Sequence, residues 1–357
     1  MIVTIKEEIF NNPKNNSDLN DLMHFFRKGK HRMHLKKVGD FIAFENSEWK
    51  KTLLRSDIDF LKESIGKLDK KEVVISQTGN EDEFNPKEAF SYLEQNLRII
   101  LEQEEYEKPF ILKIIKEFDS SNELINALQN NWLEFYNGAG SNSESILRTR
   151  ITRDISTNQH FKEPLNKYLR FYEIKDSDRE YCTFNNGEVI PQELPEKKTK
   201  FLKKENIPYH ILYKREKENY MPDSVFNGFL QTAKKNDDRK EFSKLYLNFT
   251  PQQKDFFDLE KGFQKKEKTT LKIEIQNLYN NFKDGKNISN KEHKVLAIGL
   301  PFSNFKSTFS NHFNHVSRED LEKRILYQPK LKSEVNLKDK TERIEFEHII
   351  HEIKYLL

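Results

Sequence analysis

The chain has 357 residues with a formal net charge of +3, and 33% of its residues are charged. This length suffices for two or three domains with cores of their own. The 28 Phe and 13 Tyr supply more burial than a disordered chain carries, which excludes disorder as the main state. The small net charge excludes a uniformly basic nucleic-acid-binding surface, so any basic surface is expected to be local.

Cysteine content and apolar runs limit the compartment and the kinds of site. Cys182 is the only cysteine, which excludes an intrachain disulfide and a cysteine-based zinc site. The first residues lack the apolar segment of a signal peptide, and no apolar run approaches membrane-spanning length. The sequence therefore predicts a soluble, cytoplasmic protein that does not enter a membrane.

Residues 1–88 mix strand and helix patterns and are expected to form an N-terminal α/β unit. The runs at residues 38–44 and 72–75 resemble strands, and the spacing at 57–68 predicts a helix. The polar stretch 77–83 indicates an exposed loop or linker.

Residues 89–222 alternate between strand and helix patterns. Strands are expected at residues 97–101, 132–136, 169–174 and 209–213, and the second is followed by an Asn-Gly-Ala-Gly-Ser turn at 137–141. After the first strand, one helical face collects the apolar residues Phe110, Ile111, Ile114, Ile115 and Phe118. This alternation predicts an α/β fold with a mostly parallel sheet flanked by helices, whose ligands bind at the carboxyl ends of the strands.

Residues 223–357 lose the strand signals and are expected to form a mainly helical C-terminal region. The last segment places Phe346, Ile349, Ile350, Ile353 and Leu357 on one helical stripe. His348 and His351 fall opposite that stripe and are expected to be solvated.

Acidic residues follow two of the expected strands. Asp176 and Asp178 come directly after residues 169–174, and side chains in a strand alternate with period two, so both carboxylates are expected on one face. Glu102 follows residues 97–101. Carboxylate oxygens are the ligands that Mg²⁺ and Mn²⁺ prefer, so three acids at two strand ends predict a metal-dependent phosphoryl-transfer site.

The order of these features resembles the Toprim domain of topoisomerases, primases and OLD-type nucleases. Residues 101–110 (LEQEEYEKPF) resemble its first motif, and residues 176–180 (DSDRE) resemble its Asp-x-Asp motif. Residues 218–220 (ENY) are similar to the Glu-Asn-Tyr signature of standalone Toprim proteins in bacterial anti-phage systems. Gln103 stands where many members have glycine, and the second acid of the first motif, Glu107, lies one residue beyond the commonest spacing. Both departures favour a nuclease over a topoisomerase or primase.

Roles for the site residues follow from this chemistry. Asp176 and Asp178 are expected to hold one Mg²⁺ or Mn²⁺, with Glu102 as a further ligand or as the general base for water. If two metals bind, Glu107 and Glu218 are the expected extra ligands. Neutralisation of phosphate charge is assigned to Arg215 or Lys217.

Simpler interpretations stand beside these roles. A lone Asp-x-Asp at a strand end is often a solvated turn, and on so charged a chain Glu107 and Glu218 are nearly as often on solvated helix faces or in ion pairs. The basic stretches 25–32 and 197–204 either follow a phosphate backbone or form solvated faces.

The resemblance implies a metal-dependent nuclease acting on DNA or RNA in anti-phage defence. The chain has no Walker A motif, and OLD-type enzymes fuse or pair a Toprim domain with an ATPase, so a separate ATPase partner is expected. Two alternatives remain open: a non-catalytic subunit that binds nucleic acid or protein, and a metal-dependent nucleotidyl transferase. The oligomeric state is also open, with a homo-oligomer as one option.

Overall fold

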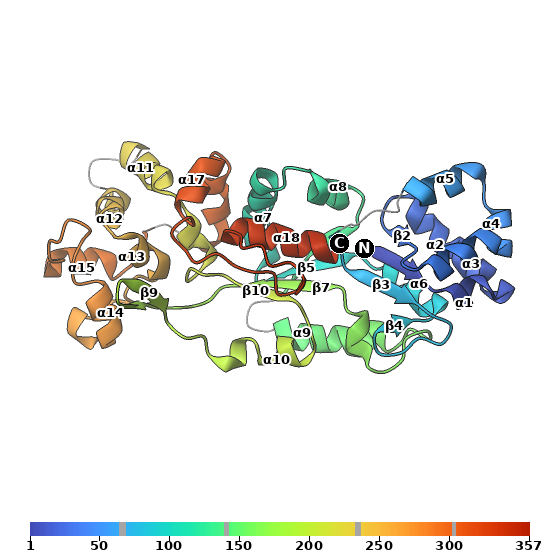
Figure 1. Cartoon of the computed structure of the whole chain (residues 1–357). Helices are drawn as coiled ribbons and strands as arrows, with labels where there is room; N and C mark the ends of the chain where they lie inside the picture. The colour runs from blue at the N-terminus through green and yellow to red at the C-terminus, as the bar shows by residue number, and fades with distance from the viewer. Residues whose placement is uncertain (64–68, 139–142, 233–236, 302–304) are drawn as a thin grey trace.

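The computed structural model describes residues 1–63, 69–138, 143–232, 237–301 and 305–357. Two parallel four-stranded sheets and a helical C-terminal region make up the chain (Figure 1). The predicted α/β class, with a parallel sheet flanked by helices and a helical C-terminal region, is confirmed. None of the helices in these ranges combines the length and the apolar character needed to cross a membrane.

The first sheet belongs to the N-terminal part of the chain. Its strands run in the order β2-β1-β3-β4, all parallel, with β1 (Ile2–Ile5), β2 (Arg32–His34), β3 (Glu72–Ile75) and β4 (Glu83–Phe84). The helical segments of this part are α1 (Glu7–Phe10), η1 (Pro13–Asn15), α2 (Asn16–Arg27), α3 (Val38–Asn46), α4 (Glu48–Thr52), α5 (Arg55–Glu63) and α6 (Pro86–Glu94). The domain boundary expected after residue 88 falls inside α6.

The strand expected at residues 38–44 is wrong, because α3 covers this segment. The β-branched and aromatic side chains favoured a strand, but the buried residues Asp40, Ala43 and Phe44 follow helical spacing. Asp40 also accepts the Lys37 backbone N–H at 3.1 Å, which closes the first turn of the helix. The helix expected over 57–68 exists as α5, although residues 64–68 lie outside the described part of the chain.

The second sheet follows in sequence and lies in the middle of the molecule (Figure 1). Its strand order is β10-β7-β5-β6, all parallel, with β5 (Leu97–Leu101), β6 (Leu133–Asn137), β7 (Phe171–Lys175) and β10 (Tyr209–Ile211). The remaining elements of this part are α7 (Glu104–Phe118), α8 (Glu123–Gln129), α9 (Ser143–Arg150), η3 (Ile151–Ile155), η4 (Leu165–Tyr168), the hairpin β8 (Cys182–Asn185) and β9 (Glu188–Pro191), η5 (Glu196–Lys198) and α10 (Lys200–Lys204). All four expected strands are present, each within two residues of its predicted bounds.

Alternate residues of β5 enter two different cores. Leu97, Ile99 and Leu101 pack with the apolar face of α7 and with the C-terminal helices. Ile100 packs with the core of the N-terminal sheet. The second sheet therefore separates two hydrophobic cores. Side chains of a strand alternate between the two faces of its sheet, and both faces of this sheet are buried.

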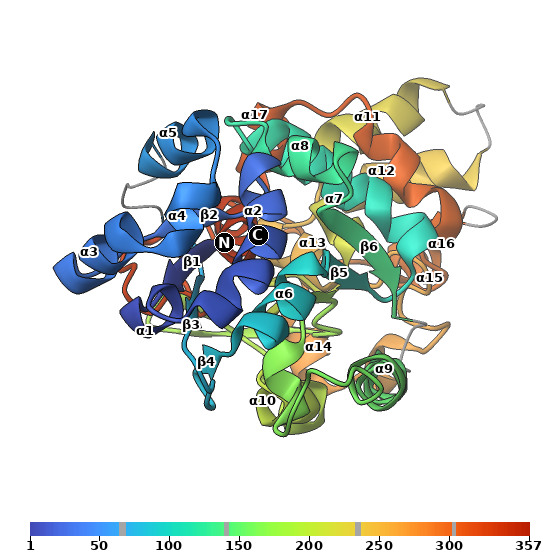
Figure 2. The ribbon, with the colours of Figure 1, turned by 90° about the vertical axis from the view of Figure 1, so that its right-hand side faces the viewer.

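The C-terminal region is helical, as predicted. Its elements are α11 (Asp223–Thr232), α12 (Asp238–Leu247), α13 (Pro251–Phe256), η7 (Lys268–Thr270), α14 (Ile273–Leu278), α15 (Asn290–Leu296), α16 (Phe305–Thr308), η8 (Phe309–Phe313), α17 (Arg318–Lys323) and α18 (Glu345–Leu356). Helix α18 returns to the middle of the molecule beside α7, where the Phe346 ring lies 5.4 Å from Phe118 and 6.1 Å from Phe110. The two ends of the chain meet there in both views, and Met1 N donates to Leu357 O at 2.8 Å (Figures 1 and 2).

The expectation that His348 is solvated is wrong, since only 4% of this residue is exposed. Its ring lies 5.4 Å from the ring of His210, a residue of β10 that lies against α18. Helix α18 is covered on more than its apolar stripe, which the sequence pattern of the helix alone does not reveal. His351 is partly buried and faces acidic residues described below.

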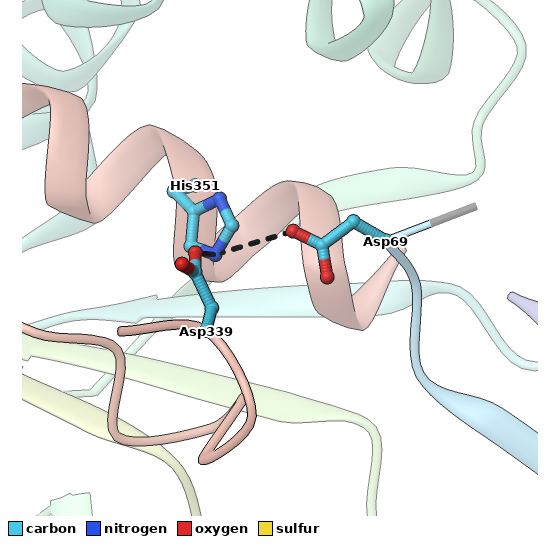
Figure 3. A group of neighbouring side chains, drawn as sticks. All are labelled: Asp69, Asp339 and His351. Carbon is cyan, nitrogen blue, oxygen red and sulfur yellow. Dashed lines mark ion pairs between the residues drawn. The ribbon is translucent and has the colours of Figure 1, made fainter. Parts of the chain in front are cut away.

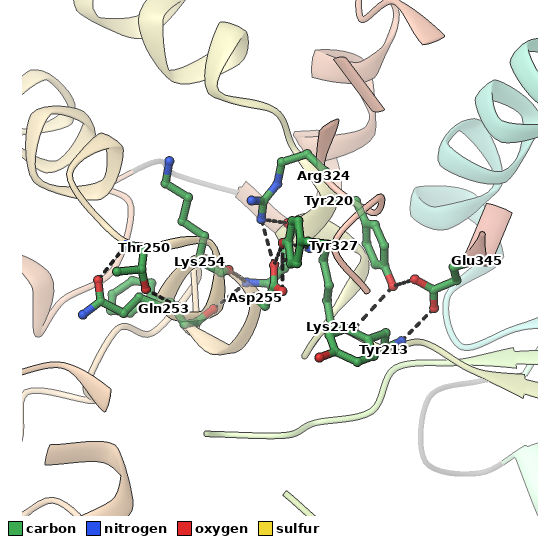
Figure 4. Close-up of polar contacts among 12 residues, drawn as sticks. Tyr213, Lys214, Tyr220, Thr250, Gln253, Lys254, Asp255, Arg324, Tyr327 and Glu345 are labelled. Atoms are coloured by element: carbon green, nitrogen blue, oxygen red, sulfur yellow. Dashed lines mark hydrogen bonds and ion pairs between the residues drawn. The ribbon is translucent and has the colours of Figure 1, made fainter. Parts of the chain in front are cut away.

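A buried polar network attaches the end of β10 to the helical region (Figure 4). Asp255 of α13 pairs with the ammonium of Lys214 and with Arg324 at 3.1 Å, and it accepts the Tyr327 hydroxyl at 2.7 Å. Glu345 of α18 accepts the Tyr220 hydroxyl at 2.6 Å and bonds His210 at 2.9 Å. These contacts fix the chain that follows β10 in place.

We expect Asp255→Asn to lower the free energy of unfolding by about 3–5 kcal/mol, because Lys214 and Arg324 would lose their shared counter-charge inside the protein. Denaturant titration of both proteins measures the difference. Asp284→Asn is the control, since Asp284 pairs with Lys286 at an exposed position and its loss should change little. Equal stability of the Asp255 variant and the control would contradict a structural role for the network.

Candidate functional site

Three neighbouring strands of the second sheet end at the same edge. Glu102 directly follows β5, Asp176 directly follows β7, and the 3-10 helix η6 (Lys217–Tyr220) follows β10. Strands β10, β7 and β5 are adjacent and parallel, so the residues after their carboxyl ends are brought together. Glu107 joins them from the first turn of α7, where the helix dipole favours negative charge.

The carboxylates of Glu102, Glu107 and Asp176 form one cluster. Each offers an oxygen, and these oxygens all lie within 4.8 Å of one another. Glu107 and Asp176 are buried, whereas Glu102 is partly exposed. The Glu102 backbone N–H donates to Glu107 Oε2 at 3.1 Å, which fixes the Glu107 carboxylate at the end of β5.

The ammonium of Lys217 lies between two of these acids. Its Nζ is 2.9 Å from Asp176 Oδ1 and 3.1 Å from Glu107 Oε2, and its side chain is 1% exposed. The Lys217 backbone N–H also donates to Asp176 Oδ1, at 3.2 Å. Lys217 therefore neutralises part of the negative charge that the strand ends concentrate.

Burial raises the pKa of Glu107 to about 7, and the negative charges of Asp176 and Glu102 add to this effect while Lys217 opposes it. Burial by itself would lower the pKa of Lys217, but attraction to Asp176 and Glu107 outweighs it, so the pKa of Lys217 is raised. One ammonium thus pairs with two carboxyl groups, so it can neutralise only part of their negative charge.

The structure separates Asp178 from Asp176. Strand β7 ends at Lys175, and Asp178 has a left-handed backbone with φ of 54°. The alternation that would place both carboxylates on one face therefore stops before it reaches them. Asp178 is exposed and pairs with Lys198, and its carboxylate is not part of the acid cluster.

Glu218 and Arg215 also lie outside the cluster. Residues 217–220 form a 3-10 helix in which Lys217 faces the acids, and Glu218 is buried but does not belong to the cluster. Arg215 pairs with Asp258 Oδ2 at 2.9 Å. Of the glycine turn, Gly138 donates its N–H to Leu101 O beside Glu102, and residues 139–141 lie outside the described part.

The sequence pattern identified Glu102, Glu107 and Asp176, but it did not identify Lys217 as their counter-ion. The sequence predicts instead that Arg215 or Lys217 neutralises charge on a bound phosphate. Asn219 and Tyr220 were part of a recognised signature, yet their contacts are structural: Asn219 donates to the Lys254 and Phe257 carbonyls, and Tyr220 bonds Glu345. Only the fold shows which residue of this segment reaches the acids.

The donor set fits Mg²⁺ or Mn²⁺. Glu102, Glu107 and Asp176 offer three hard oxygens, and the partial exposure of Glu102 gives solvent access to one side. No family model, curated protein or solved structure matches the chain.

We expect Lys217→Met to lower the free energy of unfolding by about 3–5 kcal/mol in EDTA, because Asp176 and Glu107 would remain buried without their cation. Added Mn²⁺ should restore part of the loss. Denaturant titration with and without Mn²⁺ measures both effects, and the exposed Lys197→Met serves as the control. A loss no larger than that of the control would show that the ammonium does not compensate the acids.

The raised pKa of Glu107 predicts a pH dependence of stability in EDTA. The folded protein holds the proton more tightly than the unfolded chain, so this contribution is full below pH 4.5, the ordinary pKa, and is lost as the pH rises through about 7. It amounts to up to about 3 kcal/mol. Glu107→Gln has no carboxyl to titrate, so its stability should fall less than that of the wild type between pH 5 and 8. Parallel pH profiles would show that Glu107 is ionised throughout.

Proposed function

We propose that this chain is a divalent-metal-dependent nuclease that hydrolyses phosphodiester bonds, with Glu102, Glu107 and Asp176 as the ligands of Mg²⁺ or Mn²⁺. The observation that carries the proposal is the convergence of these three carboxylates at the carboxyl edge of a parallel sheet. Acids placed so close together repel one another unless a cation lies among them.

The metal, when bound, would polarise a phosphoryl oxygen and lower the pKa of a bound water. Glu102 is the partly exposed acid of the cluster and is placed to accept the proton of the attacking water. Lys217, buried beside Asp176 and Glu107, adds positive charge behind the position that a phosphate would occupy. Asp176 and Glu107 keep their orientation through the Lys217 and Glu102 backbone N–H groups.

A basic segment beside the acids supports a nucleic-acid substrate. Lys198 donates to the Asp176 carbonyl at 2.9 Å and pairs with Asp178. Four other lysines of the same segment are exposed: Lys197, Lys200, Lys203 and Lys204. Exposed lysines that lead to a carboxylate cluster suit a polyanionic backbone, in either DNA or RNA.

The resemblance to Toprim nucleases also suggests a role for the protein in the cell. It supports an effector of anti-phage defence in the cytoplasm that works with a separate ATPase subunit.

A second candidate function rests on Lys217. An ammonium that is 1% exposed and bonded to two acids is itself a permanent counter-ion. This favours a non-catalytic subunit that keeps the fold and binds nucleic acid or protein through the basic segment. The two candidates differ in whether a metal can bind at these acids.

We expect the purified chain, alone or with an ATPase encoded beside it, to cleave plasmid, single-stranded DNA or tRNA in Mg²⁺ or Mn²⁺ and to stop in EDTA. Asp176→Asn and Glu102→Gln should each lower the rate by a factor of about 100 or more, because each removes charge at the developing transition state. Gel assays of substrate cleavage with thermal melts of each variant separate lost activity from lost folding.

Glu105→Gln is the matched control, since Glu105 is exposed on the same turn of α7 as Glu107 and should retain full activity. Asp178→Asn should lose less activity than Asp176→Asn, because its carboxylate lies outside the cluster. Activity that persists in EDTA would refute the metal mechanism. Absence of both cleavage and Mn²⁺ binding would favour the non-catalytic subunit.

A further inference from the structure

A second group of metal-ligating side chains joins the two ends of the chain, away from the acid cluster. Asp69 precedes β3, Asp339 lies in the loop before α18, and His351 lies on α18 (Figure 3). His351 Nε2 is 3.0 Å from Asp339 Oδ2 and 3.8 Å from Asp69 Oδ2. The three ligand atoms lie within 4.8 Å of one another.

In each aspartate, Oδ2 is the inner oxygen, which faces His351, and Oδ1 is the outer oxygen, which accepts a hydrogen bond. The Thr341 backbone N–H donates to Asp339 Oδ1 at 2.9 Å, and the Asn336 side-chain amide donates to Asp69 Oδ1. Both donors belong to the loop that precedes α18. Hydrogen bonds to the outer oxygen orient a carboxylate so that the inner oxygen is presented to a metal.

The atoms of Asp339 and His351 that face each other are buried. Asp339 Oδ2 and His351 Nε2 are 3.0 Å apart and shielded from solvent, and His351 Nε2 makes no hydrogen bond to the described residues. A buried imidazole nitrogen without a hydrogen bond is expected to have a further partner, such as an ion. Arg343 Nη2 lies 2.7 Å from Asp339 Oδ2, so one guanidinium offsets one of the two carboxylates and the group stays negative.

We propose that Asp69, Asp339 and His351 bind one Zn²⁺ ion. One imidazole nitrogen and two carboxylate oxygens are zinc ligands, and three protein ligands leave a fourth position for water. Imidazole favours zinc over Mg²⁺, which separates this site from the all-oxygen cluster of Glu102, Glu107 and Asp176. A cavity of about 620 Å³, lined by Asp69 and Asp339 among others, gives the ion a path from solvent.

The bound ion would tie the N-terminal sheet to the C-terminal helix. Asp69 is three residues before β3, whereas Asp339 and His351 belong to the last twenty residues of the chain. Metal binding that fastens segments so distant in sequence stabilises the folded state, since the unfolded chain does not preform the site. The alternative is an ion pair of protonated His351 with the two aspartates, which needs no metal.

The test uses the full chain, stripped with a chelator, dialysed, and then titrated with Zn²⁺ alone or with Co²⁺ as a spectroscopic substitute. We expect one equivalent of retained zinc by elemental analysis, cobalt absorption bands of a nitrogen- and oxygen-ligated ion, and a higher melting temperature with zinc. His351→Asn and Asp339→Asn should lose all three. The exposed His315→Gln and the cluster variant Glu107→Gln should retain them.

Asp69→Asn covers the case in which the other two variants do not fold, because Asp69 has a 57% exposed side chain and its loss should weaken zinc binding about tenfold or more. Zinc retained equally by His351→Asn, or no zinc retained by the wild type, would overturn the proposal and leave the ion pair. Because the readouts are stoichiometry, spectrum and melting temperature, the result is independent of any nuclease activity.

Discussion

Buried charge in the short segment after β10 is the constraint on which both the acid cluster and the packing of the helical C-terminal region depend. Residues 214–220 pass between the second sheet and the helical region, and five of these seven residues are buried: Lys214, Lys217, Glu218, Asn219 and Tyr220. Lys214 requires Asp255, Lys217 requires Asp176 and Glu107, and Tyr220 requires Glu345. Removing any one partner would leave a charge or a hydrogen-bond donor unpaired inside the protein, so these contacts hold the segment in one position.

This arrangement links the acid cluster to the C-terminal helices. Lys217 reaches the acids because η6 turns at that residue, and η6 is held by the contacts of Asn219 with α13 and of Tyr220 with α18. A divalent cation that enters the cluster has to compete with an ammonium whose position is set by packing elsewhere. The chemistry at the sheet edge and the docking of the helical region are therefore parts of one polar system.

The two groups of residues that we propose to bind metal differ in how the fold creates them. The acid cluster arises from topology, since adjacent parallel strands end at the same edge and their following residues must meet. The group of Asp69, Asp339 and His351 arises from the return of α18 to the N-terminal sheet, which brings together residues nearly three hundred positions apart. A local sequence pattern predicts the first kind of site and carries no signal for the second.

The sequence by itself determined the α/β class, the four strands of the second sheet, the apolar face of α7 and the acids Glu102, Glu107 and Asp176, because periodicity and strand-end position are local properties. Only the tertiary structure decided that Asp178 leaves the cluster, that Lys217 enters it and that His348 is buried. The position of Asp178 depends on where β7 ends and on the left-handed backbone of Asp178 itself. The position of Lys217 depends on a 3-10 turn, and the burial of His348 depends on the segments that pack against α18. Each depends on packing between segments distant in sequence, which no single run of residues encodes.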